Sequence, residues 1–150
     1  MKNIILTSIA LLSFTFSYAQ VGQVKEVTSW ETIGKLTNPY KYVELSKAEF
    51  DDGFTMYMLT YQNLEYEQIT DLANIQFEAT EDELDYVYNE LLKGTAMKKN
   101  DEAVSLDIGK GTLFISRAAA GQVRLMYKED GVPFKRTWLS KGQLRKLFGK

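Results

Sequence analysis

The chain has 150 residues, of which 45% are hydrophobic and 25% charged, with 18 Lys and Arg against 20 Asp and Glu. This composition is typical of a single globular domain, and the near-neutral charge gives no general attraction to nucleic acid or other polyanions. Because the chain contains no His and no Cys, a Ser-His-Asp triad, thiol catalysis, disulfides and metal sites built from imidazole or thiolate are all excluded.

Residues 1–19 have the features of a secretory signal peptide. Lys2 supplies the positive charge, an apolar segment follows, and Ser17-Tyr18-Ala19 fits the small-x-small pattern of a cleavage site. The apolar segment is shorter than the ~20 residues that a membrane-spanning helix needs, so we expect no transmembrane anchor. The sequence therefore predicts cleavage near Ala19 and a secreted or periplasmic protein with one α+β domain, residues 20–150.

The first part of this domain is predicted to form strands. TSWETIGKL, residues 28–36, fits a strand, although apolar side chains at every third position over residues 21–33 leave a helix as the alternative. Asp51-Asp52-Gly53 separates the next two apolar patterns and has the composition of a hairpin turn. We interpret residues 54–61 as a central strand covered on both sides, because large apolar side chains occupy both of its faces.

Tyrosines are frequent in this region. A tyrosine has an apolar ring and a polar hydroxyl, which suits both strands and binding surfaces. Tyr57, Tyr61 and Tyr66 are a candidate platform for a sugar or a peptide. The alternative interpretation is that their rings pack in the core.

Two more hairpin turns are predicted in the second half of the chain. Gly109-Lys110-Gly111 and Glu129-Asp130-Gly131 each supply glycine where a tight turn needs a positive φ. The segments AVSLDI and TLFIS, on either side of the first turn, alternate apolar and polar residues as strands with one buried face do. Pro133 cannot donate a hydrogen bond to a neighbouring strand, so it favours an edge strand after the second turn.

Two helices are predicted, and each begins with a capping box directly after a strand pattern. Thr80 with Glu83 starts the mid-chain helix, and Ser140 with Gln143 starts a short helix at the C-terminal end. Both helices carry an apolar stripe at helical spacing. The stripes consist of Leu84, Val87, Tyr88, Leu91 and Leu92 in the first helix and of Leu144, Leu147 and Phe148 in the second.

The predicted fold is an α+β domain in which an antiparallel sheet of hairpins is covered on one face by both helices. The two strand-to-helix joints lie sixty residues apart, which suggests two strands-then-helix halves, but strand residues at the same offset mostly do not correspond. The alternative architecture is a small β-barrel capped by the C-terminal helix.

Charge is segregated along the chain. Residues 48–92 contain twelve acidic residues and no basic ones, whereas residues 93–150 contain thirteen basic and five acidic residues. Opposite charge on successive segments favours their packing together or a head-to-tail contact between copies. The basic candidates for a binding surface, with the aromatic residue between them, are Lys135, Arg136, Trp138, Lys141, Arg145 and Lys146. The alternative is that these side chains form an ordinary solvated surface.

These observations predict a non-enzymatic binding or accessory protein of the periplasm or cell exterior that acts through protein-protein contacts. The expected partner is another protein or a second copy of the chain, joined through the charge-segregated surfaces. Export and the acidic total argue against nucleic acid as the partner. We predict no catalytic residue, no metal site and no cofactor.

The alternative function is a small carboxylate-dependent hydrolase acting on glycans. Two carboxylates held ~5 to 9.5 Å apart can cleave a glycosidic bond. Glu49 with Asp51, and Glu65 with Glu67, are pairs on a common strand face. A cleft with two close carboxylates, one of them with a raised pKa, would favour the hydrolase over the binding protein.

Overall fold

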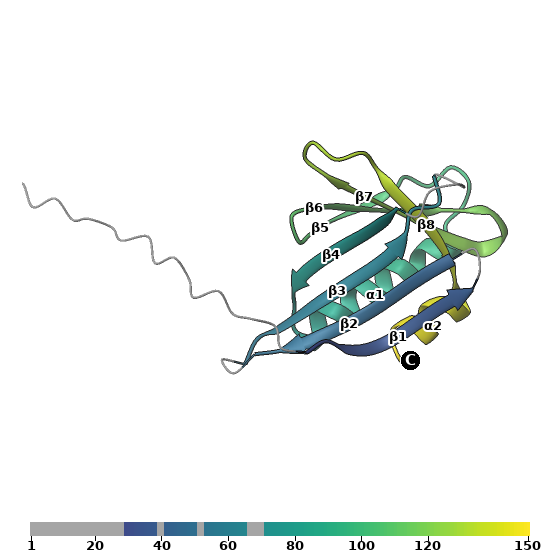
Figure 1. Cartoon of the computed structure of the whole chain (residues 1–150). Coiled ribbons are helices and arrows are strands. Elements are labelled where there is room, and N and C mark those ends of the chain that lie inside the picture. Colours follow the sequence, from purple (N-terminus) through teal and green to yellow (C-terminus); the bar gives the residue numbers. More distant parts are fainter. Residues whose placement is uncertain (1–28, 39–40, 51–52, 66–70) are drawn as a thin grey trace, which may run out of the picture.

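The computed structural model describes residues 29–38, 41–50, 53–65 and 71–150, so the predicted signal peptide lies outside the described residues. The described chain forms two four-stranded antiparallel sheets and two α-helices (Figure 1). The elements are β1 (Glu31–Asn38), β2 (Lys41–Glu49), β3 (Thr55–Gln62), β4 (Leu72–Glu78), α1 (Glu81–Ala96), β5 (Val104–Ile108), β6 (Gly111–Arg117), β7 (Gln122–Glu129), β8 (Lys135–Ser140) and α2 (Lys141–Leu147).

The α+β prediction is confirmed, and so is the prediction of two strands-then-helix halves. Strands β1 to β4 form one sheet (sheet A) in chain order, and β5 to β8 form the other (sheet B) in the same order. Each half is therefore an antiparallel meander followed by a helix. Neither sheet closes on itself, so the alternative of a small barrel is wrong.

The local signals account for the ends of these elements. Both capping boxes are present: the Thr80 hydroxyl accepts from the Glu83 N–H, and the Ser140 hydroxyl accepts from the Gln143 N–H. Gly109 sits at φ 61° in the β5–β6 turn, where glycine avoids the steric cost of a positive φ. The turn residues Asp51 and Asp52 lie outside the described residues.

The strand predictions are confirmed with one correction. Residues 28–36, for which a strand and a helix were both possible, overlap the strand β1. Pro133 precedes the edge strand β8. β3 is central in sheet A, but the two faces of this strand differ in burial. Tyr57 and Tyr61 point into the core, whereas Met56 on the opposite face is only half-buried. The prediction that β3 is covered on both sides was therefore wrong, because no helix of the described residues packs on the outer face of this sheet.

The fixed offset of sixty residues hid the repeat because the connecting loops differ in length. α2 starts sixty residues after α1, but β7 starts at residue 122 and β3 at residue 55. Nine residues separate β3 from β4, whereas five separate β7 from β8. A comparison at one constant offset therefore aligns the helices and misaligns the strands that precede them.

The two helices are exchanged between the halves. α1 follows sheet A but packs on β6 and β7 of sheet B, and α2 follows sheet B but packs on β1 and β2 of sheet A. Each helix starts within three residues of the strand before it, which leaves too little chain to fold the helix back across its own sheet. The prediction that both helices cover one face of a single sheet was wrong for this reason.

Both helices approach the opposite sheet through a glycine. A Cβ on Gly94 of α1 would lie 2.4 Å from Cγ2 of Val123 in β7. A Cβ on Gly34 of β1 would lie 2.3 Å from the carbonyl oxygen of Leu147 in α2. Glycine therefore permits a helix–strand approach in each half that no other residue would allow without movement.

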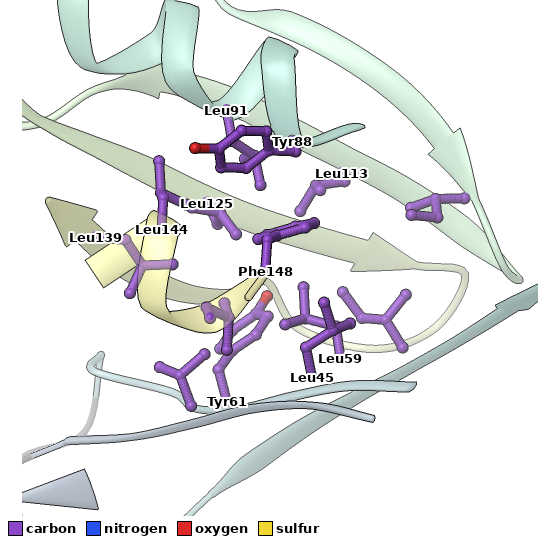
Figure 2. Close-up of a cluster of buried hydrophobic side chains, with 14 of the residues drawn as sticks. Leu45, Leu59, Tyr61, Tyr88, Leu91, Leu113, Leu125, Leu139, Leu144 and Phe148 are labelled. Atoms are coloured by element: carbon purple, nitrogen blue, oxygen red, sulfur yellow. The ribbon is translucent and has the colours of Figure 1, made fainter. Parts of the chain in front are cut away.

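The inner faces of both sheets and the two helices share one core. Leu144 and Leu147 of α2 are completely buried, and the rings of Phe148 and Tyr88 pack with centroids 5.2 Å apart. Figure 2 shows Phe148 between Leu113 on one side and Leu45 and Leu59 on the other. Burying three such side chains contributes on the order of 1.5–3 kcal/mol each, which holds this short helix in place.

The free edge of β8 is covered by groups from sheet A. The Leu64 N–H donates to the Arg136 carbonyl at 2.8 Å, and the Arg136 N–H donates to Oδ1 of Asn63 at 3.0 Å. The Lys41 ammonium donates to the Trp138 carbonyl. These bonds join the halves and satisfy backbone groups that an edge strand leaves unpaired. No helix in the described part of the chain has the length and apolar character needed to cross a membrane.

Candidate binding surface

The outer face of sheet B is not covered by either helix. α1 contacts this sheet through Ile115 and Val123, which point to the inner face and are fully buried. Because side chains alternate along a strand, their neighbours in sequence point outward. The cross-strand register places Phe114, Met126 and Arg136 in one outward row, and Arg124 and Trp138 in the next.

Large apolar and basic side chains dominate this outer face. We call it the basic-aromatic face and define it as Phe114, Arg124, Met126, Lys128, Phe134, Arg136 and Trp138. The rings of Phe114 and Phe134 pack with centroids 6.1 Å apart at 57°, and Nζ of Lys128 lies 5.4 Å from the Phe134 centroid. Phe134 remains 42% exposed. The face is thus an organised cluster with one ring still accessible to solvent.

The cations of this face are poorly neutralised. Arg124 and Lys128 form no ion pair within the described residues, and Arg136 has only a long contact of 4.0 Å with Glu65. Nε of Arg136 is buried and has no hydrogen-bond partner in the described part of the chain. Among the outward positions of β5 to β8, Asp107 carries the one carboxylate, and it accepts a hydrogen bond from Thr112. The face therefore carries a net positive charge.

A cavity of about 260 Å³ lies between β4 and the β7–β8 hairpin. Its lining combines the apolar residues Leu72, Ala73, Tyr127, Val132 and Pro133 with the polar residues Asn74, Glu129 and Lys135. Leu72, Val132 and Phe134 are all more than a third exposed. Large exposed apolar side chains that gather in one region are typical of an interaction surface.

The structure separates the basic residues that the sequence grouped together. Arg136 and Trp138 belong to the basic-aromatic face. Lys135 instead points toward sheet A, where its ammonium pairs with Asp71 at 2.8 Å and holds the pKa of that carboxyl below its usual range. The remaining predicted cations, Lys141, Arg145 and Lys146, are exposed on α2.

The two predicted tyrosines lie in the core. Tyr57 is 3% exposed and stacks on Phe77, and Tyr61 is fully buried. The Tyr61 hydroxyl donates to the Lys135 carbonyl at 2.9 Å, and burial raises the pKa of this hydroxyl. Their rings therefore pack in the core, as the alternative interpretation states. Tyr66, the third predicted tyrosine, lies outside the described residues.

Sequence reasoning missed five residues of the face: Phe114, Arg124, Met126, Lys128 and Phe134. The signal was present, because Arg124, Met126 and Lys128 alternate with buried Val123, Leu125 and Tyr127. A single alternating strand does not reveal which side chains lie beside it on the sheet. That information comes from the pairing of β7 with β6 and β8.

A second surface is acidic. Glu78 and Glu83 line both a cavity of about 400 Å³ between β4, β5 and α1 and an adjoining cavity of about 600 Å³ at the start of α1. Glu81 lines the second cavity, and no Lys or Arg lines either of them. We call these two cavities the acidic groove. Tyr86 lines the first of these cavities and is 56% exposed.

Four carboxyl groups of the described residues have a displaced pKa, and all four are displaced downward. Hydrogen bonds from the Thr80 N–H and hydroxyl lower the pKa of Glu83. The other carboxyl groups whose pKa is displaced, those of Glu44, Glu49 and Asp71, are also displaced downward by hydrogen bonds and ion pairs. A general acid needs the opposite shift. Asp51 and Glu67, each one member of a predicted pair, lie outside the described residues.

The described residues contain no group of three or more acidic side chains arranged to hold a metal ion. By its geometry, then, the chain is an α+β protein made of two four-stranded meanders with exchanged helices. Comparison with known proteins gave no match: no family model, no curated protein and no solved structure is significantly similar to it. Its function must be inferred from its own surfaces.

Proposed function

We propose that this protein is an exported, non-enzymatic binding protein that acts through protein-protein contacts, with the basic-aromatic face as its contact surface. One observation carries the proposal: Arg124 and Lys128, which have no ion pair within the described residues, alternate with large apolar side chains on a sheet face that neither described helix covers. Arg, Trp, Phe and Met are the residue types enriched in the centres of protein interfaces.

The charge of the face indicates the kind of partner. Arg124 and Lys128 have no carboxylate to neutralise them within the described residues, so an acidic surface would gain attraction without breaking an existing ion pair. Complementary charge mainly accelerates association and selects the partner, while buried rings supply most of the affinity. Phe134 and Trp138 are the rings placed to supply it.

Photo-crosslinking in the cell that makes the protein tests this function. A crosslinking amino acid at position 134 should form an adduct with another polypeptide, and the same amino acid at position 58 should not. Met58 is the matched control because it lies on the outer face of sheet A. The adduct should disappear in Arg124→Glu/Lys128→Glu. An adduct of equal yield from both positions, or one unaffected by the charge reversal, contradicts the proposal.

The export component has its own test. The proposal is supported by residues 1–19, which combine a basic start, an apolar segment and a small-x-small site. Intact-mass measurement of the protein recovered from cells should give a chain that begins at Gln20. Recovery of the chain with Met1 and the apolar segment retained, in the cytoplasmic fraction, would rule export out.

The second candidate function is carboxylate-dependent hydrolysis of a glycan, favoured by the acidic groove and the exposed ring of Tyr86 beside it. The downward displacement of the pKa of Glu83 speaks against it. Release of reducing sugar from cell-wall and storage glycans, compared between the native chain and Glu78→Gln, tests this function. Release that depends on Glu78 would replace the binding proposal with the enzymatic one.

A further inference from the structure

The acidic groove complements the basic-aromatic face in both charge and residue type. Glu78 and Glu81 form no ion pair with any residue in the described ranges, and neither does Asp82 beside them in the first turn of α1. Asp85 is paired with Lys150 at 2.6 Å, so the unpaired charge is concentrated at the start of the helix. The structure thus presents an unneutralised anionic site and an unneutralised cationic site on one chain.

Each of the two sites also carries an aromatic residue that is exposed. Tyr86 is the most exposed large apolar side chain of the described residues, and Phe134 is the next. A ring flanked by carboxylates can insert among rings flanked by cations, which combines apolar burial with cation–π and ionic attraction. This pairing of anchors is what a contact between the two sites requires.

We propose that the partner of the basic-aromatic face is a second copy of this chain, which contributes its acidic groove and the first turn of α1. This inference rests on the proposed function and names its partner. Within one chain the two sites cannot meet, because α1 is held against the inner side of sheet B while the basic-aromatic face points away from it. The contact must therefore join different copies.

The geometry of this contact determines the kind of assembly. Each site carries charge of one sign, so two basic-aromatic faces repel each other and so do two acidic grooves. The contact is therefore heterologous, and an open assembly has one unoccupied site of each kind to which a further copy can bind. Repetition of such a contact gives a ring or a growing chain rather than a two-fold dimer.

Sedimentation velocity and light scattering on the full mature chain test the association. At about 50 mM salt, where charges within ~14 Å still interact, the average mass should at least double as concentration rises. At about 500 mM salt the protein should return to the monomer mass. A chain that stays monomeric at both salt concentrations and at every protein concentration overturns the inference.

Two charge-reversal variants make the test specific. Arg124→Glu/Lys128→Glu reverses two charges of the basic-aromatic face. Glu81→Lys/Asp82→Lys reverses two charges in the first turn of α1. Each variant alone should be monomeric, because each lacks one half of the contact. Mixed in equal amounts they retain one native junction between them, and their two reversed sites also carry opposite charges, so association should be restored.

Lys141→Glu/Arg145→Glu is the matched control, since both side chains are exposed cations on α2 and the charge change is the same. This control should associate like the native chain, and circular dichroism should show that all three variants are folded. A mixture that remains monomeric, or a control that also dissociates, contradicts the proposed contact. If the crosslinker at position 134 captures a different polypeptide while the chain stays monomeric, the proposed function stands and the second copy is not the partner.

Discussion

The two sheets have the same topology, yet their outer faces differ in whether the charged side chains have partners within the chain. On sheet A, Glu44 accepts hydrogen bonds from Thr32 and Tyr42 and pairs with Lys35 at 3.3 Å. On sheet B, Arg124 has no such partner in the described residues. A face whose charges are satisfied internally has little to gain from a partner, whereas an unsatisfied face has much to gain. Repeated architecture therefore does not imply repeated function.

The largest expected effect comes from the exchanged helices. Leu91 of α1 and Leu147 of α2 are both fully buried, each against the sheet of the other half. Leu91→Ala and Leu147→Ala should each lower the free energy of unfolding by about 2–5 kcal/mol, because each leaves a cavity in the shared core. Chemical denaturation with two probes should give one transition. Two separate transitions would show that the halves do not share a core.

The glycine contacts sharpen the comparison between the halves. Gly34→Ala sets a methyl group against the backbone carbonyls of α2, which cannot rotate away, and should cost about 3 kcal/mol. Gly94→Ala meets the side chains of Val123 and Ile115, which can yield more than a backbone can, and alanine also gains about 1 kcal/mol of helix propensity over glycine. Thermal unfolding should therefore show the larger loss for Gly34→Ala. An equal or reversed order would mean that the end of α2 yields more easily than β7.

The pH dependence of stability tests the joint between sheet A and sheet B. Desolvation lowers the pKa of Lys41 to about 8, below its ordinary value of 10.5. Between these two pH values the unfolded chain binds more protons than the folded one, so stability should rise with pH, by at most about 1.4 kcal/mol per unit. Lys41→Met should remove this rise. Urea denaturation at several pH values from 8 to 9.5 measures it, and parallel curves for the two proteins would refute the role of Lys41.

The smallest effects separate the two outer faces. Glu44→Gln weakens the exposed network on sheet A and should cost no more than about 1 kcal/mol, with association unchanged. Arg124→Glu/Lys128→Glu breaks no described ion pair and loses only the contact of Lys128 with the Phe134 ring, so it should cost no more than about 1 kcal/mol, but it should abolish association. Denaturation and sedimentation on the same samples compare the two. Loss of association in Glu44→Gln would mean that sheet A also takes part in binding.

Much of the fold follows from local signals. The capping boxes of Thr80 and Ser140 and the alternation within β5 and β6 predicted elements that the structure contains. The number of sheets and the exchange of helices were not predicted, because both depend on which strands pair and on how little chain joins each strand to its helix. Periodicity reports which side of an element is apolar, not which element that side meets.

The basic-aromatic face was predicted only in part for the same reason. Arg136 and Trp138 were found because they are close in sequence to other basic residues, whereas Phe114 and Arg124 join them only across the sheet. Tyr57 and Tyr61 show the converse limit, since an aromatic strand residue has the same pattern whether its side faces solvent or the core. Deciding between these needs the tertiary packing, such as the approach of β8, whose Lys135 carbonyl accepts from the Tyr61 hydroxyl.

The exchange of helices also dictates an order of events during synthesis. β1 and β2 are made first, but the helix that shields their apolar side begins only at residue 141. A nascent polypeptide that ends just before that point contains all eight strands, but the apolar side of β1 and β2 is not yet covered by α2. Proteases should therefore degrade it readily. Resistance to digestion should appear abruptly, when Leu144 and Leu147 have been added, and not by stages as the strands accumulate.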